Sequence, residues 1–374
     1  MLTQAQLEII LIASVVAASS ATIGTFLVLR KLALMSDAIS HAILFGIVLM
    51  FFLIESTASL PMLLAATATG VLTVYLVESL VLTRLVKEDT AIGLVFPALF
   101  SIGVILISRY AANVHLDTDA VLLGELAFAP FDRLVIGGTD IGPRSLWMAL
   151  GVGILNLTFI LLFYKELKLA TFDAGLAAAL GFSPILLHYA LMTLVSVTAV
   201  SSFEAVGSVL VVALMIAPPA AAYLLTDRLP LMLALGAGLG VVSAVSGYFV
   251  ARALDASIAG SMATMAGVVF TLVLFFAPQR GLVPRWARRR RQRVQFAGET
   301  LLVHLLNHET DPDAADECLM DHMARHMQWH DRFSTQVVQY VTGNALATKE
   351  RSHGQQRLRL TTKGRSLAQE VMLR

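Results

Sequence analysis

The sequence predicts an all-α polytopic membrane protein of eight or nine transmembrane helices, followed by a small soluble α+β domain. Of its 374 residues, 57% are hydrophobic and 14% are charged, and the mean hydropathy is +0.76. A soluble domain cannot bury that much apolar surface. Because long apolar runs end near residue 281 and charges gather beyond it, we expect a membrane domain (1–281), a polybasic juxtamembrane linker (282–296) and a cytosolic domain (297–374).

Each predicted span is an apolar run that approaches the roughly 20 residues a bilayer requires. The runs are 7–29, 36–54, 60–82, 91–108, 146–164, 185–200, 204–225, 231–250 and 257–277. No basic residue precedes the first run, so we interpret it as a retained span rather than a signal peptide.

The basic residues between the spans predict the orientation. If the chain starts outside and crosses at each run, most of them face the cytoplasm: Arg30, Lys31, Arg84, Lys87, Lys165, Lys168, Arg228, Arg280 and Arg285. The exceptions are Arg109, Arg133, Arg144 and Arg252. This asymmetry predicts an outside N-terminus and a cytoplasmic C-terminus.

Three segments depart from a simple run of spans. Residues 110–145 hold several glycines and prolines and predict a re-entrant segment or a surface helix. Ser201 and Glu204 have capping-box spacing, which predicts that a helix begins there. The alanine-rich stretch 171–182, with a helix ended by Gly181, falls on the cytoplasmic side. It needs either a protein partner or the membrane surface to cover its apolar residues.

The second span carries an acid and an imidazole, Asp37 and His41, at i and i+4. This spacing places both side chains on one helix face, one turn apart. A carboxylate within hydrocarbon normally faces a cavity, a partner or a cargo, and this ligand pair suits a divalent transition metal. A hydrogen-bonded pair that stabilises the bundle is the alternative.

Gly236 and Gly240 form a small-xxx-small pair, which predicts close helix packing.

The tail reads as helices 298–307, 314–327, 334–344 and 363–373, with a hairpin at 347–360 before the last helix. Three helices followed by a hairpin is the order of elements in a winged-helix domain, which is related to the helix-turn-helix DNA readers. From residue 294 onward there are ten acidic and nine basic residues. A DNA-binding module usually has a basic face, so we expect a regulatory or interaction role and disfavour nucleic acid. The arginine run 288–293 indicates contact with anionic membrane lipids.

Four segments together resemble the permease subunit of bacterial ABC importers for manganese, zinc and iron, the type 3 metal permeases. They are Leu29–Gly46 with its Ser-Asp-Ala-Ile-Ser-His core, Lys87–Gly93, Thr171–Gly181, and Ser202–Ala221 with Phe203, Gly207 and Pro218. The resemblance implies a type II ABC importer-like fold in the bacterial plasma (inner) membrane. The wing and final helix also resemble those of metal-dependent repressors.

The resemblance also implies site residues. Asp37 and His41 match the family's channel metal ligands, and Glu125 matches an acid that is commonly Asp. Phe45 stands where many members have proline. The segment that docks on the ATPase matches Thr171, Phe172, Asp173, Ala174, Gly175, Leu176, Ala177, Ala178, Ala179, Leu180 and Gly181.

We therefore expect the permease of an ATP-driven importer of a divalent metal, with manganese favoured over zinc and iron and no permanently bound cofactor. The expected partners are cytosolic ABC ATPase subunits, a second permease copy or paralogue, and an extracytoplasmic metal-binding protein. No Gly-x-x-x-x-Gly-Lys-Ser/Thr motif occurs, so ATP hydrolysis is expected on another chain. The alternatives are a membrane-tethered metal-responsive transcription regulator and an ion-coupled secondary metal transporter.

The tail carries a candidate second metal site, because Cys-x-x-Asp-His places three potential ligands within one helical turn and three histidines repeat at i+4. The residues are Cys318, Asp321, His322, His326 and His330. The alternative is a solvated helix face that carries histidines.

Overall fold

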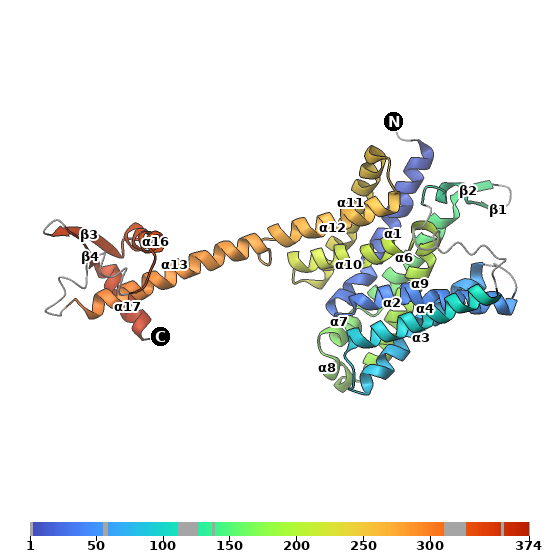
Figure 1. The fold of residues 1–374 in the computed structure, drawn as a ribbon, viewed down its shortest axis with the longest axis horizontal. Helices are drawn as coiled ribbons and strands as arrows, with labels where there is room; N and C mark the ends of the chain where they lie inside the picture. Colours follow the sequence, from blue (N-terminus) through green and yellow to red (C-terminus); the bar gives the residue numbers. More distant parts are fainter. Residues whose placement is uncertain are drawn as a thin grey trace. The chain divides into compact units, whose positions relative to one another are not determined.

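The computed structural model describes residues 3–54, 59–110, 126–136, 139–309, 327–352 and 355–373. The chain divides into two compact units, Met1–Arg280 and Gly281–Arg374 (Figure 1), and each has its own hydrophobic core. Within the described part of the first unit, nine helices are long and apolar enough to cross a membrane. The predicted count of spans is confirmed.

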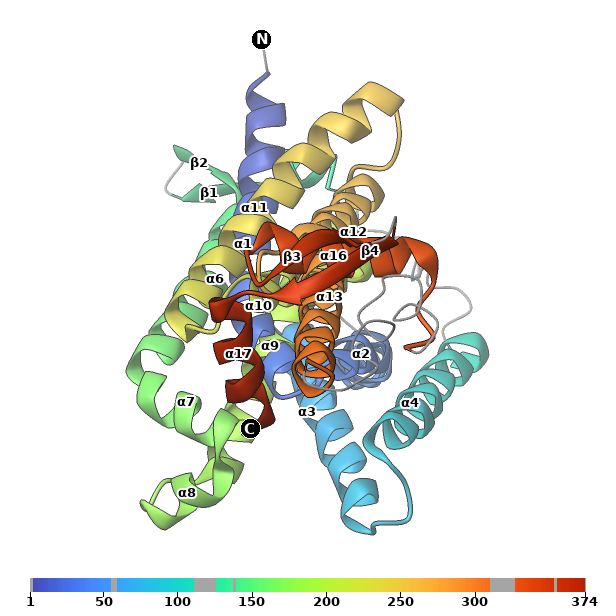
Figure 2. The same cartoon turned by 90° about the vertical axis from the view of Figure 1, so that its left-hand side faces the viewer.

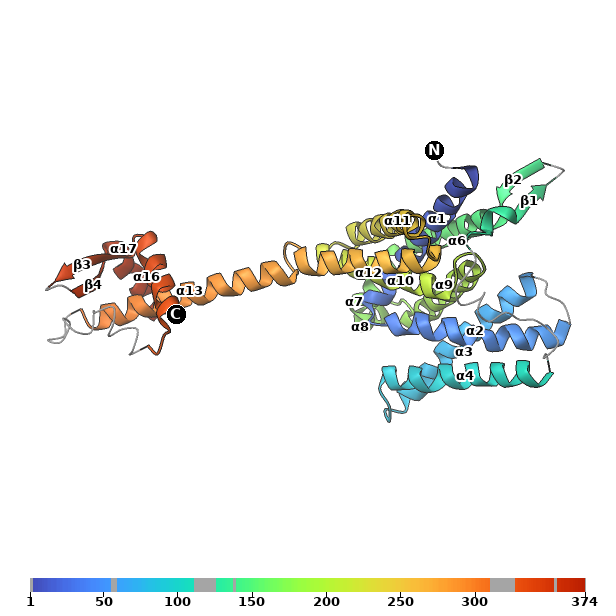
Figure 3. The same cartoon turned by 45° about the horizontal axis from the view of Figure 1, so that its top comes forward.

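The spanning helices of the first unit account for most of its described residues. They are α1 (Gln4–Leu29), α2 (Ala33–Ile54), α3 (Ser59–Leu82), α4 (Glu88–Tyr110), α6 (Arg144–Leu162), α9 (Pro184–Val206), α10 (Ser208–Leu225), α11 (Leu229–Leu254) and α12 (Ile258–Phe276). Helix α1 is the central element and packs against α6, α9, α10 and α11. Helices α2, α3 and α4 pack together, and α9 contacts both α2 and α3 (Figure 3).

Small residues allow the helices to approach closely, as the glycine pattern predicts. Gly240 of α11 lies against the backbone of Ala17 in α1. Gly247, two turns further along α11, lies against the backbone of Met262 in α12, so closely that a Cβ at Gly247 would be 2.3 Å from Met262 Cα. One buried amide joins three helices, because Asn156 donates hydrogen bonds to Ser19 Oγ (3.0 Å) and Thr198 Oγ1 (2.8 Å).

The predicted helix start at Ser201–Glu204 is wrong. Both residues lie inside α9, and the break falls at Gly207, between α9 and α10, where φ is +79°. A positive φ of this kind favours glycine, which explains why the chain turns there and not at the Ser-x-x-Glu spacing. Pro218 and Pro219 lie within α10 without ending it.

The region predicted as a re-entrant segment or surface helix forms neither from residue 126 to residue 143. Its described part contains a short 3-10 turn, η1 (Ala129–Phe131), and an antiparallel hairpin of β1 (Arg133–Ile136) and β2 (Thr139–Pro143). Arg133 binds this hairpin to α1. Its Nη1 lies 2.9 Å from Glu8 Oε2, and its Nε lies 2.8 Å from Asp140 Oδ2. The expectation failed because the glycine and proline content of a segment does not by itself distinguish a hairpin from a re-entrant or surface helix.

Replacing Arg133 with Met is expected to loosen the hairpin selectively. The Gly142 N–H and the Arg133 guanidinium lower the pKa of Asp140, so the ion pair is present at neutral pH and is lost only as acid protonates this carboxylate below its ordinary range. Hydrogen exchange of the β1 and β2 amides should accelerate at neutral pH, while α1 exchanges as before. Arg144→Met, at an exposed neighbour, is the control; equal exchange in both variants would contradict this role.

The described residues of the second unit form helices and one small sheet. Its elements are α13 (Leu282–Asn307), α16 (Asp331–Gly343), the antiparallel strands β3 (Ala347–Ser352) and β4 (Gln355–Leu360), and α17 (Thr362–Met372) (Figure 2). The predicted hairpin and final helix are confirmed. The predicted helix 314–327 lies outside the described residues, so the winged-helix assignment stays a prediction.

The structure defines the conformation of two segments of the tail. The predicted juxtamembrane linker 282–296 is helical and forms the first part of α13, because its arginines are good helix formers. The third tail helix begins at Asp331 with His330 as its N-cap, and not at Ser334. Apolar residues on one face of α16, among them Val337 and Val341, pack into the core of this unit.

Candidate functional site

The sequence-predicted pair Asp37 and His41 lies in the first half of α2, on one helix face. His41 Nε2 is 3.5 Å from Asp37 Oδ1. Two ligand atoms that bind one divalent ion at roughly 2.0–2.2 Å, with an angle near 90–110°, are themselves roughly 3.0–3.5 Å apart. The observed separation therefore allows both side chains to bind one ion.

Helix α4 supplies an aromatic wall beside the imidazole. The ring of His41 lies 5.7 Å from that of Phe96 and 6.2 Å from that of Phe100, measured between centroids. Helix α2 runs without interruption through Phe45, and Phe45 lies against Gly103 of α4. Two aromatic rings of α4 therefore flank the imidazole.

The pair is not sealed within the single chain. The side chain of Asp37 is 47% exposed and that of His41 is 34% exposed. No group of three or more His, Cys, Asp or Glu residues lies close enough to hold a metal within the described part of the chain. A carboxylate at membrane depth does not face hydrocarbon without compensation. Asp37 and His41 therefore offer two potential ligand side chains, and their exposed side leaves room for a further ligand or a water-filled path.

Most of the other predicted ligands lie outside the described residues. Glu125 is one of them, although the next residue, Leu126, is buried in the core of the first unit. The tail residues Cys318, Asp321, His322 and His326 are also outside. His330 is described, and its extended backbone begins α16, so it does not continue a helix from His326.

The predicted ATPase-docking segment forms two short helices. Helix α7 (Tyr164–Phe172) ends at the first two residues of the segment, and α8 (Ala174–Ala179) follows after Asp173. The Asp173 carboxylate caps α8 by accepting a hydrogen bond from Leu176 N (2.9 Å), and Gly181 turns the chain with φ of +89°. The exposed Phe172, Leu176 and Leu180 give this end of the unit an apolar surface.

Sequence reasoning missed a polar cluster that joins four helices near this segment. Glu78 of α3 lies 2.7 Å from His188 Nε2 of α9 and accepts a hydrogen bond from Tyr189 O–H. Arg30, at the end of α1, reaches both His188 and Thr171. Glu78 is the only acid in the predicted span 60–82, and an acid in a span is a signal for such a partner.

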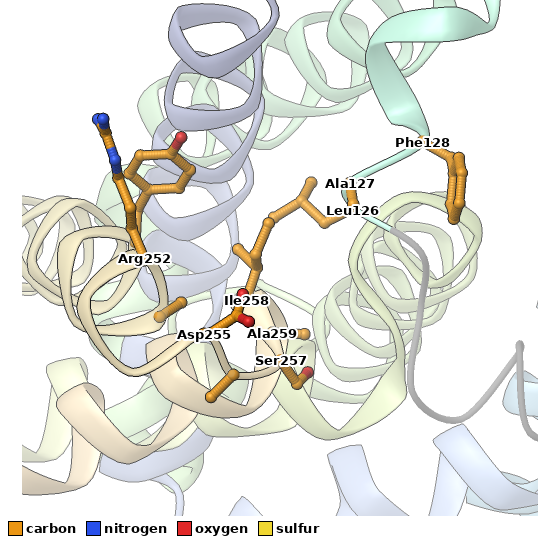
Figure 4. A pocket seen from close by; sticks show the side chains of 11 residues that line it. Leu126, Ala127, Phe128, Arg252, Asp255, Ser257, Ile258 and Ala259 are labelled. Carbon is orange, nitrogen blue, oxygen red and sulfur yellow. The ribbon is translucent and has the colours of Figure 1, made fainter. Parts of the chain in front are cut away.

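A separate pocket lies elsewhere in the first unit (Figure 4). It has a volume of about 440 Å³ and lies between residues 126–128 and the turn from α11 to α12. Its charged residues are Arg252 and Asp255. An arginine beside a single acid is not a set of metal ligands, so this pocket does not replace the α2 site.

The model of the ABC 3 transport family matches residues 3–277. The chain belongs to this family. The match covers every described spanning helix, so these helices form an ABC-importer permease.

Relatives of this ABC 3 permease include transport proteins for two metals. The zinc transport system membrane protein TroD of Treponema pallidum is 48% identical over 97% of this chain and 98% of its own length. The manganese transport system membrane protein MntD of Bacillus subtilis is 48% identical over 76% of this chain and 96% of its own. The match to TroD therefore extends into the second unit.

A solved structure supports the same membrane architecture. PsaBC from Streptococcus pneumoniae, in complex with Fab, superposes with a TM-score of 0.64 at 29% sequence identity, and the match covers 77% of this permease and 96% of that chain. A putative metal-chelate type ABC transporter in an inward-facing conformation shares the fold, with a TM-score of 0.53 at 19% identity.

Proposed function

We propose that this permease imports a divalent transition-metal ion and that Asp37 and His41 bind the ion on its way. The 3.5 Å spacing of their ligand atoms carries the proposal. One hard carboxylate and one imidazole, with no thiolate, favour manganese or iron over a strictly soft metal. TroD is named for zinc and MntD for manganese. Because the ligand chemistry favours manganese, we rank manganese first, with zinc and iron next.

The open side of the site supports a pathway completed by other groups. Glu125 is the first candidate for a third ligand, since it directly precedes the buried Leu126. A second permease copy or a paralogue, packed against the exposed face of Asp37, would enclose the ion and remove the carboxylate from hydrocarbon. We infer that an extracytoplasmic binding protein delivers the ion.

Energy for transport would come from separate ABC ATPase subunits that dock on residues 171–181. The exposed apolar residues of α8 and its flanks fit a protein partner. We place this segment in the cytoplasm of a bacterial inner-membrane protein, with the N-terminus outside and the C-terminus inside, because the basic residues favour that orientation.

The second unit is proposed to be a winged-helix regulatory domain. The hairpin β3–β4 followed directly by α17 supports this order of elements. Regulation through a metal bound by the tail histidines stays a prediction.

The test is uptake into proteoliposomes that hold the permease with its ATPase and binding protein. We expect ATP-dependent manganese uptake, competed by zinc and iron and absent without the ATPase. Uptake without any ATPase would instead establish an ion-coupled secondary transporter. DNA binding by the full chain, with no metal uptake, would establish a tethered regulator.

A further inference from the structure

Arg30 ends α1 and forms the tight turn into α2. Its backbone N–H donates to Phe26 O (3.0 Å), and the Leu32 N–H donates to Leu27 O (2.8 Å). Lys31 between them has φ of +64°. Helix α2 begins three residues after Arg30, and Asp37 lies one turn into it. The guanidinium is therefore attached to the same short turn that positions the first ligand of the metal site.

The guanidinium contacts the chain on both sides of α8. Its Nε donates to Thr171 Oγ1 (3.1 Å) in the last turn of α7, and its Nη1 lies 3.4 Å from His188 Nδ1 in the first turn of α9. Arginine has only donors, so Nδ1 must accept, and the imidazole proton then lies on Nε2. One side chain thus contacts the chain on both sides of α8, the short helix that follows α7 (Figure 2).

The cluster continues from His188 into α3. His188 Nε2 lies 2.7 Å from Glu78 Oε1, although the angle departs from that of a hydrogen bond. Tyr189 O–H donates to Glu78 Oε2 (2.5 Å). The acid and imidazole have metal-ligand chemistry, but the neighbouring guanidinium opposes a bound cation. A role in holding helices together fits the cluster better than a second ion site.

Helix geometry places the cluster between the metal site and α8. Gly70 of α3 lies against both Ile39 of α2 and Ser196 of α9, so these residues mark one layer. Glu78 follows Gly70 by eight residues, and His188 precedes Ser196 by eight, which is about 12 Å along each antiparallel helix. Ile39 lies between Asp37 and His41 in sequence.

One guanidinium nitrogen has no partner in this arrangement. Arg30 Nη2 is buried and donates no hydrogen bond to any of the described side chains or backbone. Burial also lowers the pKa of Arg30, although arginine keeps its charge in proteins. A buried, unsatisfied charged donor is unfavourable. A small shift of the neighbouring helices that gave Nη2 an acceptor would therefore lower the free energy.

We propose that Arg30 is a positioning residue that couples movement of the α7–α8 segment to the α1–α2 turn, and so to Asp37 and His41. The inference rests on the proposed function. A partner that displaces α8 moves Thr171 relative to His188. The guanidinium binds both residues, and its own backbone forms the turn, so the turn and the start of α2 must follow.

The experiment measures manganese uptake and ATP hydrolysis in the same proteoliposomes, with the complete transporter. Arg30→Gln is expected to lower the number of ions imported per ATP hydrolysed by about tenfold, the effect of losing charge-assisted hydrogen bonds. Thr171→Val, which removes only the hydroxyl, should lower it by about threefold. Manganese binding to the detergent-solubilised complex should stay within about twofold of wild type, since neither residue contacts the ion.

Lys31→Gln is the matched control, because Lys31 is the adjacent, exposed basic residue of the same turn, and its ratio should equal that of wild type. If Arg30→Gln imported as many ions per ATP hydrolysed as wild type, the coupling role would be overturned. The same holds if this number fell only in proportion to a loss of manganese binding. If Arg30→Gln fails to assemble, Thr171→Val decides in the same way. A wild-type complex that imports no metal would overturn the proposed function itself. Failure of the proposed function is thereby distinguished from failure of the coupling role, in which the wild-type complex imports metal and only the variant result differs from the expectation.

Discussion

Asp37→Asn is expected to reduce metal uptake by about 100-fold or more. The substitution keeps the size of the side chain and removes the charge that would compensate a divalent ion. Removing one partner of a desolvated charge pair costs roughly 3–5 kcal/mol, which is more than a factor of about 100 in affinity. Uptake of manganese is measured in proteoliposomes, and assembly of the permease with the ATPase is measured by size-exclusion chromatography.

The control for this prediction is Asp132→Asn, the same chemical change at an exposed acid outside the spanning helices. It should leave uptake unchanged. His41→Ala should act like Asp37→Asn, because both residues are ligands of one ion. If Asp37→Asn assembled normally and transported at the wild-type rate, the pair would be a structural feature of α2 and not part of the pathway.

Gly247→Ala is expected to destabilise the membrane unit by roughly 1–3 kcal/mol and to lower its Tm by roughly 2–10 °C. The added Cβ would lie 2.3 Å from Met262 Cα and 2.8 Å from Met262 N. Since these are backbone atoms, no rotamer change relieves the overlap, and α11 must move away from α12. Thermal unfolding in detergent measures the effect.

Gly238→Ala provides the comparison within the same helix. A Cβ at Gly238 meets nothing within 4 Å in the described structure, so this variant should match wild type or be slightly more stable, since alanine favours the helix. Equal Tm values for the Gly247 and Gly238 variants would show that α11 and α12 do not depend on this contact.

The sequence predicts the spanning helices and the shared helix face of Asp37 and His41 well, for physical reasons. A span must be a long apolar run, so the run 257–277 and the helix Ile258–Phe276 nearly coincide. Asp37 and His41 share a face because i and i+4 do so in any helix. Both results depend on local rules.

Features that depend on distant residues were not predictable in this way. The polar partners of Arg30 lie 141 and 158 residues along the chain, and no periodicity links them. The α9–α10 break also shows the limit of local rules. The Ser-x-x-Glu spacing predicts a start at Ser201, yet Gly207, with its positive φ, is where the backbone turns.

The central claim is that Asp37 and His41 together bind the transported ion. The most direct test is the amount of manganese bound by the purified complex, measured by elemental analysis for wild type, Asp37→Asn and His41→Ala. Manganese retained by wild type and lost from both variants, with all three complexes assembled, is the predicted result. Wild-type manganese content in either variant would contradict the account.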